Sequence, residues 1–355
     1  MTTRAGRGVV AVDGVHELVD MSAVRARYRR PGPHLTVVMP VARPGEPDDD
    51  LHVRWRATMA ALRRDGADDT LVELADRCVR TLDHRGLDVL ISADHTDATT
   101  CWLTEGRPAP MVHVGDHPRL LPAIVELHDR LPVVGAVVDR IGADLFVVEH
   151  VDLRPAGAVH GEEEFVHRGS PGGWSQARWQ RHSEHVWERN AALITARLAE
   201  LAGRRGTPLV VVTGDDRATG FVAAHAQRLE DIEIHVVDAG GRHEPESPAR
   251  LHAAALEVWR TRRRAAVDHD LDRLRAAVGR GDLGVEGGAT VRRAVTEHRV
   301  DRLFVDVEDA RADGDDPTDA VVAAAFEQGA SVVPVRDAGL DDGLGALLWY
   351  PEERA

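Results

Sequence analysis

The sequence contains no lysine, so all 44 of its basic side chains are arginine. Cysteine is almost as scarce: two residues, Cys78 and Cys101, exclude a disulfide framework and favour a reducing cytoplasm. The first 19 residues lack the apolar core of a signal peptide. No apolar run approaches the roughly 18 residues that a membrane span needs. We therefore expect a cytoplasmic protein with neither a disulfide scaffold nor a membrane partner.

Acidic residues are abundant and unevenly placed. The 355 residues carry 59 acidic side chains against the 44 arginines, a formal net charge of −15. From Asp301 onward there are fourteen acids and four arginines, a net charge of −10, whereas residues 167–205 hold seven arginines and three acids. The net charge therefore does not exclude RNA binding. It predicts that the middle of the chain faces RNA and that the acidic end faces water or a protein.

The order of apolar segments predicts an α/β protein of three domains. A length of 355 residues allows two to three domains, and we place them at 1–131, 132–246 and 247–355. Runs typical of buried strands are found at 35–41, 88–92, 100–103, 111–114, 133–138, 143–148, 151–159, 208–213, 232–237, 303–307, 331–335 and 346–350. Helical periodicity is found at 50–64, 69–82, 118–131, 175–202, 215–229, 249–278, 289–298 and 318–328.

Two short segments of the middle domain predict local geometry. Residues 139–142 separate two apolar runs and predict a hairpin. The later strand–helix–strand order predicts a parallel pair of strands with a crossover helix.

A glycine pair opens the longest helix of the middle domain. Gly172 and Gly173 can adopt backbone conformations with positive φ and come close to another backbone or to a phosphate. Ser175 is the expected N-cap of the helix that follows. The free N–H groups of a helix start favour anions, so this loop is a candidate site for phosphate.

Helical geometry separates the side chains of this helix into two faces. At about 100° per residue, one side carries a basic row, formed by Arg178, Arg181, His185 and Arg189. The opposite side is predicted to pack, at Trp179, Val186, Asn190 and Leu193. A plain solvent-facing charged surface, bordered by Glu184 and Glu188, is the alternative explanation of the basic row.

At these residues the sequence resembles the archaeal and eukaryotic class I peptide chain release factors and the Pelota-like proteins related to them. Their motif is a basic loop, Gly-Gly-Gln, Ser, small residues, Arg-aromatic and a long basic helix. The matching residues are Gly172, Gly173, Ser175, Arg178 and Trp179. The segments 287–305, 329–333 and 343–350 resemble the C-terminal domain of that family, an α/β/α sandwich of the ribosomal-protein type. The resemblance covers roughly residues 132–350.

Two departures from the family pattern concern activity. In members that hydrolyse peptidyl-tRNA, the third motif residue is a glutamine that helps to position water, whereas this chain has Trp174; Gln176 lies two positions further on. Stop-codon reading in the eukaryotic members uses a lysine-containing motif that a chain without lysine cannot carry. The resemblance therefore implies a protein that does not terminate translation in the usual way.

The bacterial branch of this family resembles ribosome-binding factors of stress and hibernation. The resemblance implies binding to rRNA or to the tRNA acceptor region, and a translational GTPase as a second partner of the middle and C-terminal domains. The side chains expected to contact RNA are Arg168, Trp174, Arg178, Arg181, His185 and Arg189. An indole can stack on a base and guanidinium groups can grip phosphates. No cofactor is implied.

Two other functions stay open. One is an enzyme, a peptidyl-tRNA or aminoacyl-ester hydrolase that acts through the backbone of its loop. Its candidate residues are Gly172, Gly173, Trp174 and Gln176. The other is a protein-interaction module whose acidic C-terminal domain docks a basic or GTPase partner.

Several further motifs have simpler explanations. His182 and His185 lack the companions of a metal site, so no metal is expected. Cys78 and Cys101 are expected to be small buried hydrophobes. Other polar segments predict an N-cap at Asp215 or Asp216, a turn at 284–288, and no acid–base pair between Asp139 and Asp144.

Overall fold

The chain divides into two compact units in the computed structural model. One unit combines residues 1–129 with 266–355, and the other comprises residues 130–265. The three domain ranges expected from the sequence stay a prediction. The structure describes residues 15–18, 20–41, 50–64, 66–82, 88–104, 110–129, 133–148, 153–162, 173–308 and 318–351.

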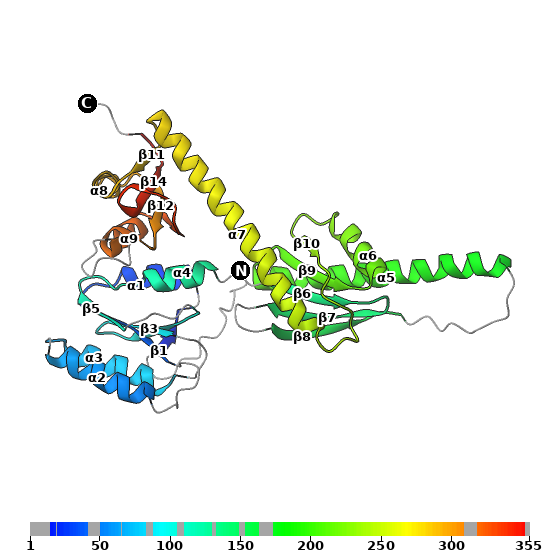
Figure 1. Ribbon diagram of the computed structural model, residues 1–355, viewed down its shortest axis with the longest axis horizontal. Helices are drawn as coiled ribbons and strands as arrows, with labels where there is room; N and C mark the ends of the chain where they lie inside the picture. Colours follow the sequence, from blue (N-terminus) through cyan, green and yellow to red (C-terminus); the bar gives the residue numbers. More distant parts are fainter. Residues whose placement is uncertain are drawn as a thin grey trace, which may run out of the picture. The chain divides into compact units, whose positions relative to one another are not determined.

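The first sheet lies in the N-terminal part of the first unit. Its strand order is β1 (Val15–Glu17), β4 (Ala98–Leu103), β3 (Asp88–Ala93), β2 (His34–Pro40) and β5 (Met111–Gly115). Strands β2, β3 and β4 are antiparallel neighbours, and β1 pairs parallel to β4. Side chains alternate between the two faces of a strand. Because β2, β3 and β4 are buried at every position, both faces of the sheet are covered. Helices α2 (Asp50–Arg64) and α3 (Asp69–Arg80) cover one face, and α1 (Met21–Tyr28) and α4 (Leu121–Asp129) the other (Figure 1).

A second sheet completes this unit. Its order is β11 (Gly284–Glu286), β14 (Leu344–Leu348), β12 (Val300–Asp306) and β13 (Ser331–Val335). Helices α8 (Gly288–Thr296) and α9 (Thr318–Glu327) cover one face, and the second half of α7 (Ser247–Arg280) packs on the other through Leu271, Leu274 and Ala277. This is the α/β/α sandwich expected from the sequence.

One hydrophobic core joins the two sheets of the first unit. Tyr28 of α1 lies 5.6 Å from Phe326 of α9 between ring centroids, and its hydroxyl donates to Asp319 at 3.1 Å. Arg25 donates to the carbonyl of Ala330 at 3.0 Å. Side chains about 300 residues apart in the sequence are therefore packed together.

The second unit contains a mixed five-stranded sheet. Its order is β10 (Glu233–Val236), β9 (Leu209–Gly214), β6 (Val133–Val138), β7 (Gly142–Val148) and β8 (Leu153–His160). The predicted hairpin is confirmed as the antiparallel pair β6–β7, and the predicted parallel pair is confirmed as β9–β10. Helices α5 (Gly173–Arg205) and α6 (Asp216–Ala226) cover one face, and the first half of α7 covers the other through Leu251, Ala255 and Trp259.

One helix was not expected from the sequence, and three local expectations need correction. Residues 25–28 form the second half of α1, and the turn expected at 284–288 contains the short strand β11. Helix α5 begins at Gly173, so Ser175 lies in its first turn and is not the N-cap. Leu193 was expected on the packed face but is 50% exposed, whereas Ile194 is buried. The buried positions 186, 190, 194 and 198 are four residues apart. The buried stripe therefore turns slowly around the helix and leaves position 193 outside it.

Candidate functional site

The predicted site begins where α5 leaves the sheet. From residue 183 onward α5 is fastened to the second unit by a buried stripe, formed by Val186, Asn190, Ala191, Ile194, Leu198, Leu201 and Ala202. Towards its start the helix continues past α6 and beyond the end of the sheet (Figure 1). Residues 173–182 add ten residues, or about 15 Å of helix. The fold therefore presents the start of α5 as an arm.

Most of the predicted site lies at or before the tip of this arm. Arg168 and Gly172 lie outside the described residues. Five further positions have a described helical backbone but no described side chain: Gly173, Trp174, Gln176, Arg178 and Arg181. Their helical placement puts Arg178 and Arg181 on the arm, before the first anchoring residue Val186.

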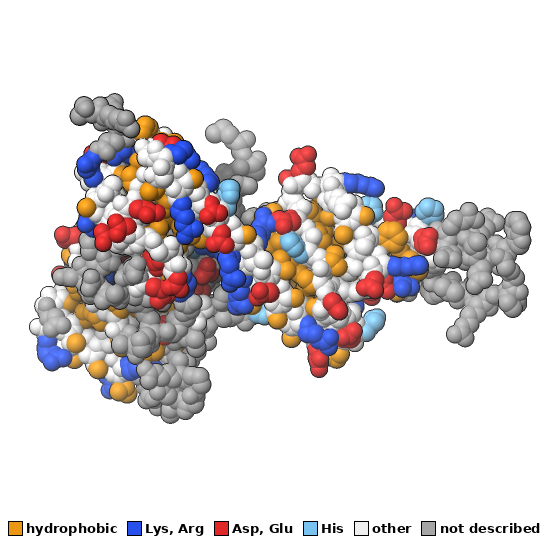
Figure 2. Space-filling model, turned by 45° about the horizontal axis from the view of Figure 1, so that its top comes forward, with side chains coloured by type: hydrophobic (Ala, Val, Ile, Leu, Met, Phe, Trp, Pro, Cys, Tyr) orange, Lys and Arg blue, Asp and Glu red, His pale blue; other side chains and the backbone are white. Residues whose placement is uncertain are grey.

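The two described members of the basic row are exposed, and each has an acidic neighbour. The Nη2 atom of Arg189 lies 2.8 Å from Oε2 of Glu162, and the two side chains are 62% and 65% exposed. His185 lies 3.9 Å from Glu188. Exposed pairs of this kind contribute about 0–1 kcal/mol, so a phosphate can replace the carboxylate at little cost. Figure 2 shows acidic and basic side chains intermixed on this unit, without a large surface of one sign on the face drawn.

A polar junction at the base of the arm was not predicted from the sequence. Asn190 was expected on the packed face of the helix and is buried there, with 4% of its surface exposed. Its amide group donates to the carbonyl of Arg140 at 2.9 Å and to that of Glu162 at 3.1 Å, and its Oδ1 accepts from the N–H of Glu162 at 2.9 Å. Asn190 thus ties α5 to the β6–β7 turn and to the end of β8.

An aromatic and ionic cluster supports the same base. The guanidinium of Arg140 lies 4.6 Å from the ring centre of Trp187 and pairs with Asp215 at 2.9 Å. Arg217 lies over the same ring at 5.8 Å and pairs with Glu184 at 3.7 Å. Asp215 is the N-cap of α6, as expected, and accepts from two backbone N–H groups.

The carboxyl of Asp215 is held in its charged form. Its partial burial would raise its pKa, but the bonds from Arg140 and from the backbone N–H of Ala218 outweigh this and lower the pKa below its usual value. The cluster holds the β6–β7 turn, the start of α6 and α5 together.

Asp139 and Asp144 both pair with Arg242. Both oxygens of Asp144 accept from Arg242, at 2.9 and 3.0 Å, and Asp139 lies 3.4 Å from the same guanidinium. These bonds raise the pKa of Arg242. The two carboxylates are therefore an ion-pair site around one arginine.

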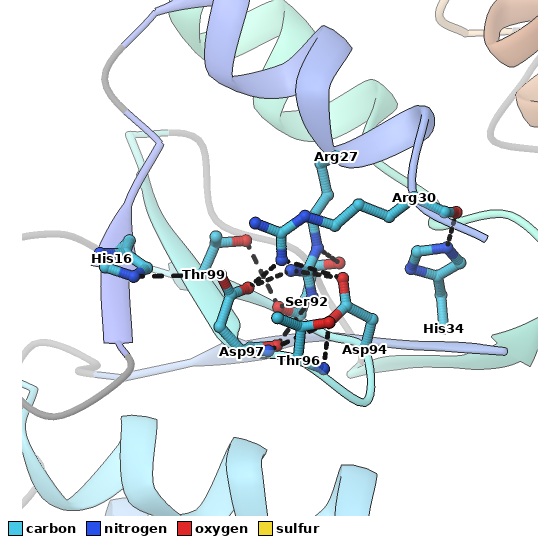
Figure 3. Close-up of polar contacts among 9 residues, drawn as sticks. All are labelled: His16, Arg27, Arg30, His34, Ser92, Asp94, Thr96, Asp97 and Thr99. Carbon is cyan, nitrogen blue, oxygen red and sulfur yellow. Dashed lines mark hydrogen bonds and ion pairs between the residues drawn. The ribbon is translucent and has the colours of Figure 1, made fainter. Parts of the chain in front are cut away.

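The densest polar cluster of the described residues lies in the first unit, and the sequence did not reveal it. Arg27 of α1 is 2% exposed and pairs with Asp94 at 2.9 Å and Asp97 at 2.5 Å (Figure 3). It also donates to the carbonyl of Ser92 at 2.8 Å. Arg30 reaches the same two carboxylates from the solvent side, at 3.1 and 2.5 Å.

Charges in this cluster compensate one another. Burial lowers the pKa of Arg27, and the two aspartates counteract that effect. Burial would raise the pKa of Asp94, but the charge of Arg27 and backbone N–H groups lower it. Burial also lowers the pKa of His34, whose Nε2 lies 3.0 Å from the carbonyl of Arg30. The guanidinium N–H groups of Arg27 donate to protein oxygens. The cluster is therefore suited to holding α1 against the β3–β4 turn rather than to binding a substrate.

The described part of the chain contains neither a three-ligand metal site nor a helix that could span a membrane. Within it, no group of three His, Cys, Asp or Glu side chains is arranged to hold a metal ion. Cys78 and Cys101 are confirmed as buried and form no disulfide, and burial raises the pKa of Cys78 to about 12. Among the same described residues, no helix combines the length and apolarity of a membrane span.

Comparison with known proteins finds relatives in sequence. Residues 132–280 match the model of bacterial archaeo-eukaryotic release factor family 2. The chain is 25% identical over 259 residues to an uncharacterized protein of Mycobacterium tuberculosis, found in strains CDC 1551 / Oshkosh and H37Rv; the match covers 71% of this chain and 68% of the relative.

Among solved structures, the chain is similar to a model of ribosome-bound archaeal Pelota and ABCE1, at 12% identity and a TM-score of 0.47, with 92% of each chain covered. It is also similar to Dom34 of S. cerevisiae, a translation termination-like factor, at 8% identity and a TM-score of 0.44, with 76% of this chain and 74% of that one covered. The segment 132–280 contains the sheet of the second unit, the arm formed by α5 and all of α7. This segment of the chain is similar to bacterial archaeo-eukaryotic release factor family 2.

Proposed function

We propose that this protein associates with the ribosome and binds rRNA or the tRNA acceptor region through the start of α5, without terminating translation. The observation that carries the proposal is the match of residues 132–280 to a release-factor family, in the same segment where α5 extends beyond the sheet. A release factor acts at the ribosome, and a projecting helix can reach an RNA surface that the sheet cannot.

The chemistry of the arm supports RNA as its ligand. Arg178 and Arg181 lie on the arm, and Arg189 lies at its base, paired with an exposed carboxylate. Arginine binds phosphate through two N–H groups at once. Trp174 at the start of the helix offers an indole for stacking on a base, a contact of about 1–3 kcal/mol. Since this tryptophan occupies the position of the catalytic glutamine, we propose binding rather than peptide release.

We propose that the protein acts in stress or hibernation, because it would occupy the ribosome without releasing peptide. The acidic region from Asp301 onward, with a net charge of −10, is suited to a protein partner rather than to RNA. We propose a translational GTPase for this role. Pull-down of purified translational GTPases by the full chain tests it, and absence of any retained GTPase contradicts it.

Ribosome co-sedimentation tests the central claim. We expect Arg178→Glu/Arg181→Glu to weaken binding by at least tenfold near physiological salt, since two phosphate contacts become repulsive. The slope of log K against log salt should fall by about 2. The matched control is Arg197→Glu/Arg204→Glu, on the anchored part of the same helix, where both arginines already lie near Glu200. We expect this control to bind like the wild type.

Two results would overturn the proposal. A wild-type chain that never pellets with ribosomes contradicts the association. Release of labelled peptide from stalled ribosomes by the wild type, lost in Gly173→Ala, contradicts the binding-only role and supports the hydrolase alternative.

A further inference from the structure

The positive charge of α7 is concentrated in one short segment. The helix carries eight arginines and four acids, and residues 258–267 contain four of these arginines and no acid. Each arginine outside that segment pairs with a carboxylate. These pairs are Arg250 with Glu246 at 2.9 Å, Arg273 with Asp270 and Arg275 with Asp272 at 3.5 Å each, and Arg280 with Asp282 at 2.6 Å.

Two arginines of the segment are held by the second unit. Arg262 pairs with Glu233 of β10. Arg263 lies four residues after Trp259, the last buried residue in the first half of α7, and is itself partly buried. Their positions therefore have a structural explanation.

Arg260 and Arg264 point the other way. At about 100° per residue, they lie about 160° from the centre of the stripe that packs on the sheet, and both are exposed. Glu257 and Asp268 are found about one turn before and after them, but no carboxylate of the described residues pairs with either guanidinium. Like charges four residues apart on a helix repel each other. Helix stability therefore does not account for this pair.

We infer that Arg260 and Arg264 form a second RNA contact of this protein, separate from the start of α5, which binds phosphates of the RNA backbone. The inference rests on the proposed function, in which the protein acts at ribosomal RNA. RNA presents closely spaced negative charges, and an exposed arginine binds a phosphate through two N–H groups at once. Side chains four residues apart on a helix are neighbours, about 5–6 Å apart at Cβ, so both guanidinium groups can reach one strand.

The test neutralises the two arginines without reversing their charge. Arg260→Gln/Arg264→Gln preserves the helix, since glutamine and arginine have nearly equal helix propensity. The matched control is Arg273→Gln/Arg275→Gln, which removes the same charge from exposed positions of the same helix, where both arginines pair with acids. Fluorescence anisotropy with a labelled RNA duplex measures RNA binding directly, and ribosome co-sedimentation measures binding in the proposed setting.

We expect Arg260→Gln/Arg264→Gln to weaken binding of the RNA duplex by about tenfold near physiological salt. The slope of log K against log salt should fall by about 2, because two phosphate contacts that release counterions are lost. Ribosome affinity should fall as well, and the control should stay near the wild type in both measurements. Equal losses in the two variants, or a salt slope unchanged from the wild type, would overturn the inference.

The two measurements separate this inference from the proposed function. A wild type that binds the RNA duplex through Arg260 and Arg264 but never pellets with ribosomes would overturn the proposed function and support the contact on α7. If Arg260→Gln/Arg264→Gln loses ribosome binding but keeps binding of the RNA duplex, this face docks a ribosomal protein, and the RNA contact is overturned while ribosome association stands.

Discussion

Arginine–carboxylate pairs occur in two settings in this molecule, and the contrast shows which of them can bind a ligand. In the first unit, Arg27 is buried and shares Asp94 and Asp97 with Arg30. On α5, Arg189 and Glu162 are both more than 60% exposed and meet through a single pair of atoms. Buried charges are held because separation leaves them without water, whereas exposed charges exchange partners freely. The first setting supports structure, and in the second the arginine can exchange its carboxylate for another anion.

The largest expected effect comes from breaking the buried setting. Arg27→Ala leaves Asp94 and Asp97 charged beside an empty, buried site, so we expect a loss of about 3–5 kcal/mol in the free energy of unfolding of the first unit. Arg30→Ala is the matched control, because it removes a half-exposed arginine from the same two carboxylates. Its loss should stay below about 1 kcal/mol. Hydrogen exchange of the β3 and β4 amides measures both values, and equal losses would contradict the contrast.

The second prediction is that acid weakens the buried pairing of Arg27 with Asp94. The folded-state pKa of Asp94 is lowered, although its burial acts in the opposite direction, because Arg27 and backbone N–H groups favour the carboxylate. A lowered pKa contributes stability that is present above the unfolded value of about 3.9 and is lost as pH falls through the folded value. Asp94→Asn lacks this carboxylate. The unfolding free energies of wild type and variant should therefore converge as pH falls below about 4, and parallel curves would contradict the assignment.

Long elements with a regular pattern were predictable from the sequence, and those built on buried polar groups were not. Strand β13 was placed at residues 331–335, and α2 at 50–64, because local apolar spacing determines both. Helix α1 was missed because Arg27, one of its three buried residues, interrupts the apolar pattern. Its burial depends on Asp94 and Asp97, about 70 residues away, which no local pattern reveals.

The candidate site shows the same limit. Its helix and its buried Asn190 were expected from periodicity, but the roles of Asn190 and Arg189 depend on Glu162, which follows the end of β8. The shared core of Tyr28 and Phe326 also depends on contacts across most of the chain. Single-sequence patterns describe which face of an element is buried; they do not describe which distant segment covers it.

The variant with the smallest expected effect tests the exposed pair of Arg189 and Glu162. Glu162→Gln removes the carboxylate beside Arg189 but keeps the backbone groups that bond to Asn190. Because the pair is exposed, the free energy of unfolding should change by less than about 0.5 kcal/mol. Freed of its partner, Arg189 should bind phosphate more readily, and ribosome affinity should rise about two- to threefold at low salt. Glu200→Gln, which removes the carboxylate beside Arg197 and Arg204 on the anchored part of α5, is the control and should leave affinity unchanged. If both variants bind alike, Arg189 is a solvated charge outside the RNA surface, and the binding face is confined to the arm before residue 183.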